Sequence, residues 1–252
     1  MKTYLNPDAQ SFKKICQRRM FMDKTALLPL LNRRIWKVGK FVCVTMPSGF
    51  GKSYLALMIS AYYSKGADSA SVFDKLNVSA SPSYKEHLNK HNVLYVDIAN
   101  LCDDSGGVDV KAYFSQKIGK ELIRNYPDYG LSTDMTFSEM LAEIFKRSGG
   151  NERFIIVIDE WDYLLRTYPD DSELFDRYVM FLKTLFKSDI AFPAIELAYM
   201  TGVIPIKRYA SMSGLNEFEE FTMVSPDELA PFFGFCEEEV KTVMKQSGTR
   251  LS

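Results

Sequence analysis

The stretch KFVCVTMPSGFGKS at residues 40–53 decides the fold of this 252-residue chain. Its first six residues are mostly β-branched or aromatic and predict a short buried strand, which Pro47, Gly49 and Gly51 then interrupt. Residues 52–63 continue with apolar side chains at helical spacing. The stretch therefore predicts a strand, a glycine-rich turn and a helix in direct succession.

The turn carries the residue types that bind a phosphate chain. Its glycines allow backbone N–H groups to point at phosphate oxygens, Lys52 supplies a cation, and Ser53 supplies a hydroxyl for Mg²⁺. The complete pattern G-x-x-x-x-G-K-[ST] requires glycine at position 46, where this chain has Met46. Because the flanking strand and helix are the context of a nucleotide-binding loop, we predict nucleotide contacts from Pro47, Ser48, Gly49, Phe50, Gly51, Lys52, Ser53 and Tyr54.

A second element of the site lies further along the chain. Residues 153–158 contain five consecutive apolar residues, which predicts a central strand covered on both faces, and Asp159 and Glu160 follow it. A carboxylate at a strand tip faces the crevice where α/β sheets bind ligands. We expect Asp159 to hold Mg²⁺ together with Ser53, and Glu160 to activate the attacking water. A solvated strand end is the alternative for the two carboxylates.

The remaining strands define the fold class. Strands are predicted at residues 40–45, 92–98, 153–158, 195–201 and 219–224, and helices at 52–63, 109–125, 136–148 and 172–187. Such alternation predicts a doubly wound parallel α/β sheet. We assign it to the additional-strand class of P-loop NTPases, with strand order 5-1-4-3-2. Thr201, at the tip of the fourth strand, either senses the γ-phosphate or caps the strand; Lys207 and Arg208 approach phosphate or lie in solvent.

Four motifs in order resemble a known family. FMDKT at 21–25, PSGFGKS at 47–53, DEWD at 159–162 and TGVIPI at 201–206 are similar to motifs of the bacterial AAA-ATPase-like family. The resemblance extends from about residue 5 to about residue 240 and implies ATP and Mg²⁺ as ligands. Family members carry Pro-Arg-Arg where this chain has Pro-Ser-Gly, so two positive charges near the phosphates are missing.

The resemblance also predicts the domain organisation. Family members continue into a helical lid and a nuclease-like domain of the PD-(D/E)XK type, for which the chain shows no signature. We expect an AAA-like ATPase domain with a basic helical lead-in over residues 1–224, and the start of a truncated lid over 225–252. The adenine pocket is expected beside residues 21–25, where Asp23 and Lys24 alternatively form a surface ion pair. Asp162 either supports the turn after the strand or caps the next helix, and Trp161 is expected to pack in the core.

Composition limits the classes of function. With 46% apolar and 25% charged residues and a net charge of −1, the chain is an ordinary globular protein, not a disordered or collagen-like one. The charge is uneven, because residues 1–40 carry ten basic side chains against two acidic ones, whereas residues 209–240 carry eight acidic and no basic side chains. These segments predict two solvated faces of opposite sign, a basic border for nucleotide or nucleic acid, or a self-association surface.

The cysteines and histidines give no metal-binding pattern. The four cysteines have no CxxC spacing, and His87 and His91 lack a third ligand in register, so we expect the histidines to be a solvated pair. Free thiols without an export signal favour the cytoplasm, and no stretch is long and apolar enough to predict a membrane span. We expect a Mg²⁺-dependent ATPase. The alternatives are a nucleotide-dependent switch or scaffold with little hydrolysis, and a nucleic-acid-associated module that binds through the basic N-terminal segment.

Overall fold

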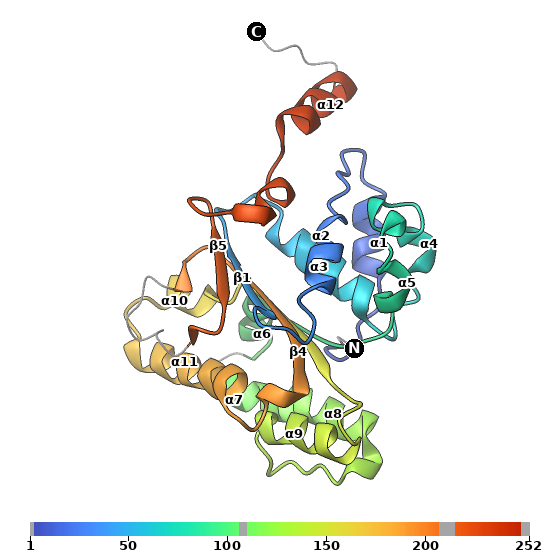
Figure 1. Cartoon of the computed structure of the whole chain (residues 1–252). Coiled ribbons are helices and arrows are strands. Elements are labelled where there is room, and N and C mark those ends of the chain that lie inside the picture. The colour runs from blue at the N-terminus through green and yellow to red at the C-terminus, as the bar shows by residue number, and fades with distance from the viewer. Residues whose placement is uncertain (1–2, 106–109, 207–214, 248–252) are drawn as a thin grey trace.

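The computed structural model of the protein describes residues 3–105, 110–206 and 215–247 (Figure 1). Five strands form one parallel sheet in the order β2-β3-β4-β1-β5. They are β1 (Phe41–Thr45), β2 (Asn92–Asp97), β3 (Phe154–Asp159), β4 (Ile195–Gly202) and β5 (Glu219–Thr222). The order is the predicted one seen from the other edge, with β4 inserted between β1 and β3. The doubly wound sheet of the additional-strand class is therefore confirmed.

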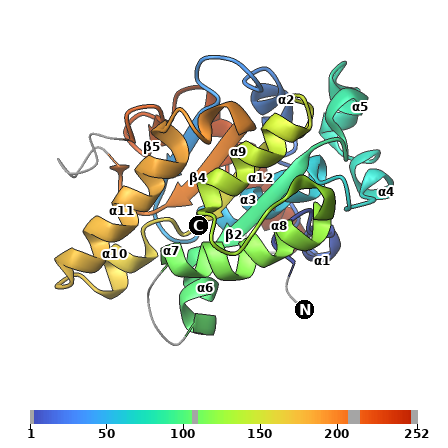
Figure 2. The same cartoon turned by 90° about the horizontal axis from the view of Figure 1, so that it is seen from below.

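Helices cover both faces of the sheet, which explains why its strands are continuous apolar runs. On β1, Phe41 and Cys43 pack on one face and Val42 and Val44 on the other. The first face is covered by helices that lie across the strands in Figure 2: α6 (Ile98–Ser105), α7 (Val110–Tyr113), α8 (Gly119–Asn125), α9 (Phe137–Arg147) and α11 (Ser172–Lys187).

The opposite face carries the N-terminal helices. They are α1 (Gln10–Cys16), α2 (Leu27–Asn32), α3 (Lys52–Tyr63), α4 (Ala70–Phe73) and α5 (Tyr84–His87), with the 3₁₀ turn η1 (Asn77–Ala80) between α4 and α5. Helix α3 has the predicted bounds, but it is buried nearly all round because α1 packs on the side that faces away from the sheet. The short helices α1, α2, α4 and α5 are too brief to give a clear sequence period.

Two of the predicted helices form close to their predicted bounds. Residues 110–125 form α7, the π-helical turn η2 (Phe114–Ile118) and α8, which follow one another without a break. Helix α9 begins with a capping box: the Thr136 hydroxyl accepts a hydrogen bond from the Glu139 N–H at 3.3 Å, and the Glu139 carboxylate accepts one from the Thr136 N–H at 2.7 Å. The short elements η3 (Pro127–Tyr129), α10 (Tyr163–Thr167) and η4 (Phe192–Ala194) complete this part of the chain.

The free edge of β2 is covered by the N-terminal segment. Leu5 pairs antiparallel with Leu94, and the Tyr95 N–H donates to the Tyr4 carbonyl at 2.9 Å. The buried carboxylate of Glu121 on α8 accepts the backbone N–H groups of Tyr4 and Leu5, each at 3.1 Å. These contacts satisfy edge groups that would otherwise be open to pairing with another chain.

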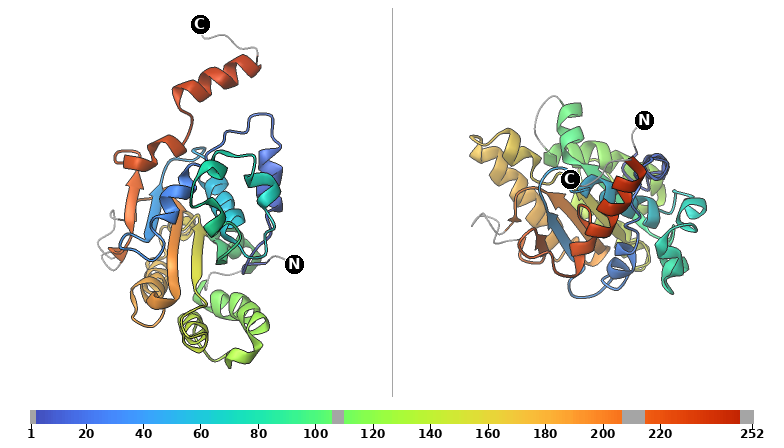
Figure 3. Two further views of the ribbon diagram at one scale, coloured as in Figure 1. Left: turned by 45° about the vertical axis from the view of Figure 1, so that its right-hand side comes forward. Right: turned by 90° about the horizontal axis from the view of Figure 1, so that it is seen from above.

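The C-terminal part leaves the sheet after β5. It forms the 3₁₀ segment η7 (Asp227–Phe232) and then α12 (Glu237–Ser247), which projects away from the rest of the molecule (Figure 3). The basic N-terminal and acidic C-terminal segments meet here, since Arg34 pairs with Glu219 and Glu228 and Lys24 pairs with Glu239. Across the described residues, no helix is long and apolar enough to cross a membrane.

Candidate nucleotide-binding site

The glycine-rich turn joins the end of β1 to the start of α3. Gly49 has φ = 86° and Gly51, the N-cap of α3, has φ = 81°, a left-handed conformation that favours glycine. Met46 has no positive φ; its side chain is buried in the core, and its N–H donates to the Gly202 carbonyl at 3.1 Å. The position that the full pattern gives to glycine is thus a packing position, and the turn still opens the N-terminus of a twelve-residue helix to an anion.

Lys52 lies folded back over this turn. Its side chain is buried, and Nζ donates a hydrogen bond to the Pro47 carbonyl at 3.1 Å. Burial lowers the pKa of Lys52, and the carboxylates of Glu160 and Asp159 oppose the shift. The cation therefore sits against the turn with two acidic groups close enough to affect its titration.

Asp159 is the meeting point of three elements. Its buried carboxylate accepts hydrogen bonds from the Thr201 hydroxyl on β4 and from the Glu160 N–H at 3.1 Å. Burial raises the pKa of Asp159; the Thr201 hydrogen bond and the nearby Ser53 side chain on α3 oppose the rise, and Asp97 adds to it. The structure thus places Asp159 in contact with Thr201 and close to Ser53.

Glu160 follows with an unusual backbone. Its φ is 56°, a left-handed conformation that is uncommon outside glycine, and its carboxylate forms an ion pair with Arg166. The Arg166 Nε also pairs with the Asp162 carboxylate at 3.2 Å. Arg166 was not predicted from the sequence; the available signal was its position four residues after Asp162 on a helix.

Asp162 supports the turn and does not cap the helix. It is fully buried, and its Oδ2 accepts the Val203 N–H at 2.9 Å and the Ile204 N–H at 2.7 Å, whereas it makes no capping hydrogen bond to α10. The neighbouring Trp161 is also fully buried, and its backbone N–H donates a hydrogen bond to the Thr201 carbonyl at 2.9 Å. The packing role expected for Trp161 is confirmed, and the two residues fasten the end of β3 to the end of β4.

A cavity of about 180 Å³ lies beside the turn. It is bounded by residues 15–24, which we call the lead-in segment, by the glycine-rich turn, by the first helical turn of α3 and by the segment before α12. The lining residues include Phe21, Met22, Lys24, Phe50, Tyr54, Phe232 and Phe235. The Tyr54 hydroxyl donates to the Met22 carbonyl at 2.9 Å, and the Gly234 N–H donates to the Phe50 carbonyl at 3.2 Å. The cavity is thus continuous with the turn and walled largely by aromatic rings.

The alternative ion pair between Asp23 and Lys24 does not form. The Asp23 carboxylate accepts the Thr25 N–H at 2.8 Å and the Asn77 N–H at 2.7 Å, whereas Lys24 binds Glu239 and the Pro231 carbonyl. Asp23 therefore holds the lead-in segment against η1, and Lys24 holds it against the C-terminal segment.

The histidines are not the solvated pair that we expected. His87 and His91 are only partly exposed, their nitrogens Nδ1 and Nε2 lie 3.0 Å apart, and the other ring nitrogen of His91 lies 2.6 Å from Glu196. No group of three or more His, Cys, Asp or Glu side chains suited to a metal ion occurs among the described residues. Lys207 and Arg208 lie outside the residues that the structure describes.

Comparison with known proteins identifies a family for this chain. No curated protein matches the chain significantly. A solved structure of the ORC2 protein of Aeropyrum pernix, described as ADPNP-ADP complexes, matches with a TM-score of 0.47 and 12% identity over 91% of this chain and 52% of that one. This chain therefore spans about half the length of that protein. The family model described as "Predicted AAA-ATPase" matches residues 8–210. Since that match covers most of the sequence and includes all four motifs, the chain belongs to the AAA-ATPase-like family.

Proposed function

We propose that the protein binds ATP with Mg²⁺ and hydrolyses it. The observation that carries the proposal is the grouping of Ser53, Asp159 and Thr201 at the tips of three elements beside the buried cation of Lys52. A lone strand-end carboxylate would be solvated, whereas Asp159 is buried, accepts a hydrogen bond from Thr201 and lies close to Ser53 in the first turn of α3. Sites with this composition bind phosphate and a divalent cation.

Each residue has a role that follows from its position. Backbone N–H groups of the turn and the N-terminus of α3 bind the phosphates, and Lys52 exchanges the Pro47 carbonyl for a phosphate oxygen. Ser53 and Asp159 would hold Mg²⁺, which neutralises charge on the phosphates when it is bound. Thr201, whose hydroxyl donates a hydrogen bond to Asp159, is the proposed sensor of the outer phosphate.

Glu160 is the proposed acceptor of the water proton. It follows Asp159 directly, has a left-handed backbone, and its side chain is partly exposed. Its Oε2 pairs with Arg166 in this structure, so Oε1 is the oxygen left to accept a proton while the pair is formed.

The cavity beside the turn is the proposed site of the adenine ring. Phe21 and Tyr54 supply aromatic walls, and Lys24 and Phe50 close its sides. We further propose that residues 1–224 form the ATPase domain and that 225–252 begin a lid, since Phe232 and Phe235 complete this same cavity. A ligand in the cavity would touch both segments.

The test is equilibrium binding of ATP with Mg²⁺, followed by single-turnover hydrolysis. Lys52→Ala should abolish binding, and Glu160→Gln should keep binding but lose hydrolysis by about 100-fold or more. Lys146→Ala and Glu143→Gln, both on α9 and on the face of the sheet opposite α3, are matched controls that should behave as the parent. Hydrolysis by Glu160→Gln at the parent rate would refute the assignment of Glu160, and failure of the parent to bind would refute the proposal.

A nucleotide-dependent switch is the second candidate, because Arg166 holds the proposed base in an ion pair. It predicts ATP binding without turnover in the parent, and an affinity for a protein or nucleic-acid partner that changes with nucleotide.

Oligomerisation through the basic N-terminal segment predicts a mass that rises with ATP in light scattering. The four free cysteines support the cytoplasm as the location of the protein.

A further inference from the structure

A second surface rich in positive charge lies at the amino-terminal ends of the strands, opposite the nucleotide site. It consists of the turn at residues 33–40, which precedes β1, together with Arg153 before β3 and Phe192 before β4. The sequence has no acidic residue between Asp23 and Asp68, so the turn itself contributes only positive charges, of which Arg34 is paired with Glu219 and Glu228. We call this set of residues the Trp36 surface.

Trp36 is the most unusual residue of the Trp36 surface. Its side chain is large and apolar, yet the residue is 49% exposed and has φ = 68°. Val38, two residues further on, is fully exposed. The left-handed conformation is strained for a bulky residue, and such strain clusters at binding sites. The Trp36 N–H donates to the Glu196 carbonyl at 3.1 Å, which holds the strained turn against β4.

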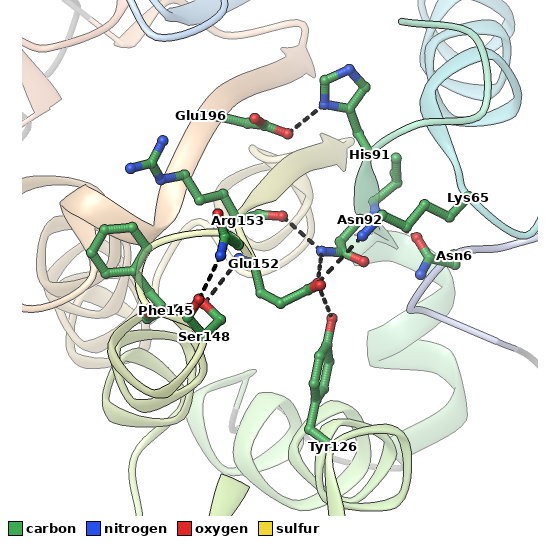
Figure 4. A network of polar contacts seen from close by, with 12 residues as sticks. Asn6, Lys65, His91, Asn92, Tyr126, Phe145, Ser148, Glu152, Arg153 and Glu196 are labelled. Atoms are coloured by element: carbon green, nitrogen blue, oxygen red, sulfur yellow. Dashed lines mark hydrogen bonds and ion pairs between the residues drawn. The ribbon is translucent and has the colours of Figure 1, made fainter. Parts of the chain in front are cut away.

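Arg153 lies against the indole. Its guanidinium carbon is 2.9 Å from the centroid of the Trp36 ring and 4.8 Å from that of Phe145, and its Nε has no hydrogen-bond partner. Figure 4 shows the side chain pointing away from the polar network around Glu152. An aromatic pair of this kind holds a planar cation in a fixed orientation.

The carboxylates nearest to Arg153 are already engaged. Glu152 accepts hydrogen bonds from Asn92 at 2.6 Å and Tyr126 at 3.2 Å and pairs with Lys65, and Glu196 pairs with His91 (Figure 4). Within the described part of the chain, no ion pair to Arg153 occurs. The guanidinium is therefore preoriented by the two rings and forms no ion pair, while the nearby charge of Glu196 acts on it.

Lys40 extends the same surface. Its Nζ lies 3.8 Å from the ring centroid of Phe192 and donates to the carbonyls of Phe192 and Ile195 at 3.2 and 2.6 Å. Burial, with a further contribution from the charge of Arg153, lowers the pKa of Lys40 to about 8, and Glu196 opposes this shift. Two cations thus stand close together, and exposed Lys37 and Arg33 add to them.

We propose that the Trp36 surface binds single-stranded nucleic acid, with Trp36 and Phe192 stacking on bases and Arg153, Lys40, Lys37 and Arg33 contacting phosphates. Exposed rings next to unpaired cations are the recurring composition of single-strand sites. A duplex keeps its bases stacked inside and would use the cations but not the rings. An acidic peptide would likewise leave the rings without a role.

The test uses the full chain without nucleotide, so that its result is independent of the proposed ATPase activity. Binding of a fluorescein-labelled 15-nucleotide oligo-dT is followed by anisotropy, with a duplex of equal length and a poly-glutamate peptide as competitors. We expect binding that weakens with salt, with a log–log slope of about −2 to −3 for three to four phosphate contacts. We also expect the two competitors to be at least about tenfold weaker.

Matched variants separate the Trp36 surface from general charge. Trp36→Ala and Arg153→Gln should each weaken binding by about tenfold or more, since loss of a stacking contact has effects of this size. Tyr168→Ala, another exposed aromatic residue, and Arg124→Gln, another exposed arginine, should leave it unchanged. Lys37→Gln, which touches no packed element, keeps the test valid if Trp36→Ala fails to fold.

Fluorescence gives a direct readout, because the chain has only two tryptophans and Trp161 is buried. Oligo-dT should quench the emission of the parent, and Trp36→Phe should remove the quenching while retaining binding. No binding at low salt would overturn the proposal. Equal binding of duplex or peptide, or variants at Trp36 and Arg153 that bind as the parent does, would overturn it as well.

Discussion

The carboxylate of Glu160 forms an ion pair with the guanidinium of Arg166, which also binds the buried carboxylate of Asp162. Arg166 therefore connects the proposed base to the residue that fastens the ends of β3 and β4 together. Because the guanidinium holds Oε2 and fixes the orientation of the carboxylate, we expect the pair to restrain Glu160 in the nucleotide-free state.

Arg166→Ala should therefore raise the single-turnover rate of ATP hydrolysis and leave ATP affinity unchanged. Both side chains are partly exposed, so the pair contributes about 0.2–1 kcal/mol, which corresponds to a gain of about 1.4-fold to fivefold. Arg177→Ala, which breaks the exposed pair with Glu173 on α11, is the matched control and should not change the rate. A lower rate in Arg166→Ala would mean that Arg166 positions Glu160 instead of restraining it.

Asp159→Asn should stabilise the metal-free protein and weaken its binding of Mg²⁺-ATP. Burial raises the folded-state pKa of Asp159 above 3.8, so between the unfolded-state and folded-state pKa values the folded chain holds more protons. The contribution of Asp159 to stability therefore falls as pH rises through that window and stays unfavourable above it. Asparagine removes the charge and retains an oxygen for the donors on Oδ1.

Thermal unfolding at several pH values tests this assignment. The melting temperature of Asp159→Asn should exceed that of the parent at neutral pH, by about 2–4 °C for each kcal/mol gained, and the difference should shrink in acid. Asp128→Asn, at an exposed position, should follow the parent throughout. A variant less stable than the parent at neutral pH would show that the ionised carboxylate is already compensated by its hydrogen bonds.

Gly202→Ala should destabilise the fold, because the glycine after Thr201 lies against the end of β3. A Cβ atom there would lie 2.5 Å from two atoms of the Trp161 ring and 2.8 Å from Asp162 Oδ1. Neither side chain can move freely, since both are fully buried. We expect a loss of about 1–3 kcal/mol in urea unfolding. Gly149→Ala, where only φ is unfavourable, should lose about 1 kcal/mol; equal losses would argue against close packing at Gly202.

The sequence predicts those parts of the site that depend on backbone pattern. The strand order, the bounds of α3 and the proximity of Ser53 to Asp159 follow from where strands end, because parallel strands bring their carboxyl ends to one edge. Met46 shows the limit of motif matching, since a buried methionine replaces the first glycine without a left-handed backbone.

The sequence does not predict contacts that depend on how individual side chains turn. The pairing of Glu160 with Arg166 requires the left-handed backbone at Glu160, which no local pattern indicates. The engagement of His91 with Glu196 joins residues 105 positions apart, so we expected a solvated histidine pair and were wrong. Trp36 shows the same limit, because its exposure depends on the strained turn before β1.

The pair of Lys24 and Glu239 should hold the start of α12 against the lead-in segment. The Lys24 Nζ also donates to the Pro231 carbonyl at 2.9 Å, and the side chains are only 7% and 19% exposed. Burial alone would raise the pKa of Glu239, but hydrogen bonds from Lys24 and from the Cys236 N–H outweigh it and the pKa is lowered. The stabilisation by Glu239 is therefore present above its unfolded-state pKa and is lost as pH falls through the folded-state value.

Glu239→Gln should destabilise the protein at neutral pH by about 1–3 kcal/mol, because it leaves the buried Lys24 cation unpaired. Adding Lys24→Met should recover part of that loss, and a double-mutant cycle measured by denaturant unfolding and by hydrogen exchange of α12 gives the coupling. Glu237→Gln breaks the exposed pair with Lys241 on the same helix and should change stability by less than about 0.5 kcal/mol. Additive effects of Lys24→Met and Glu239→Gln would show that α12 is held by the aromatic contacts of the preceding segment and not by the ion pair.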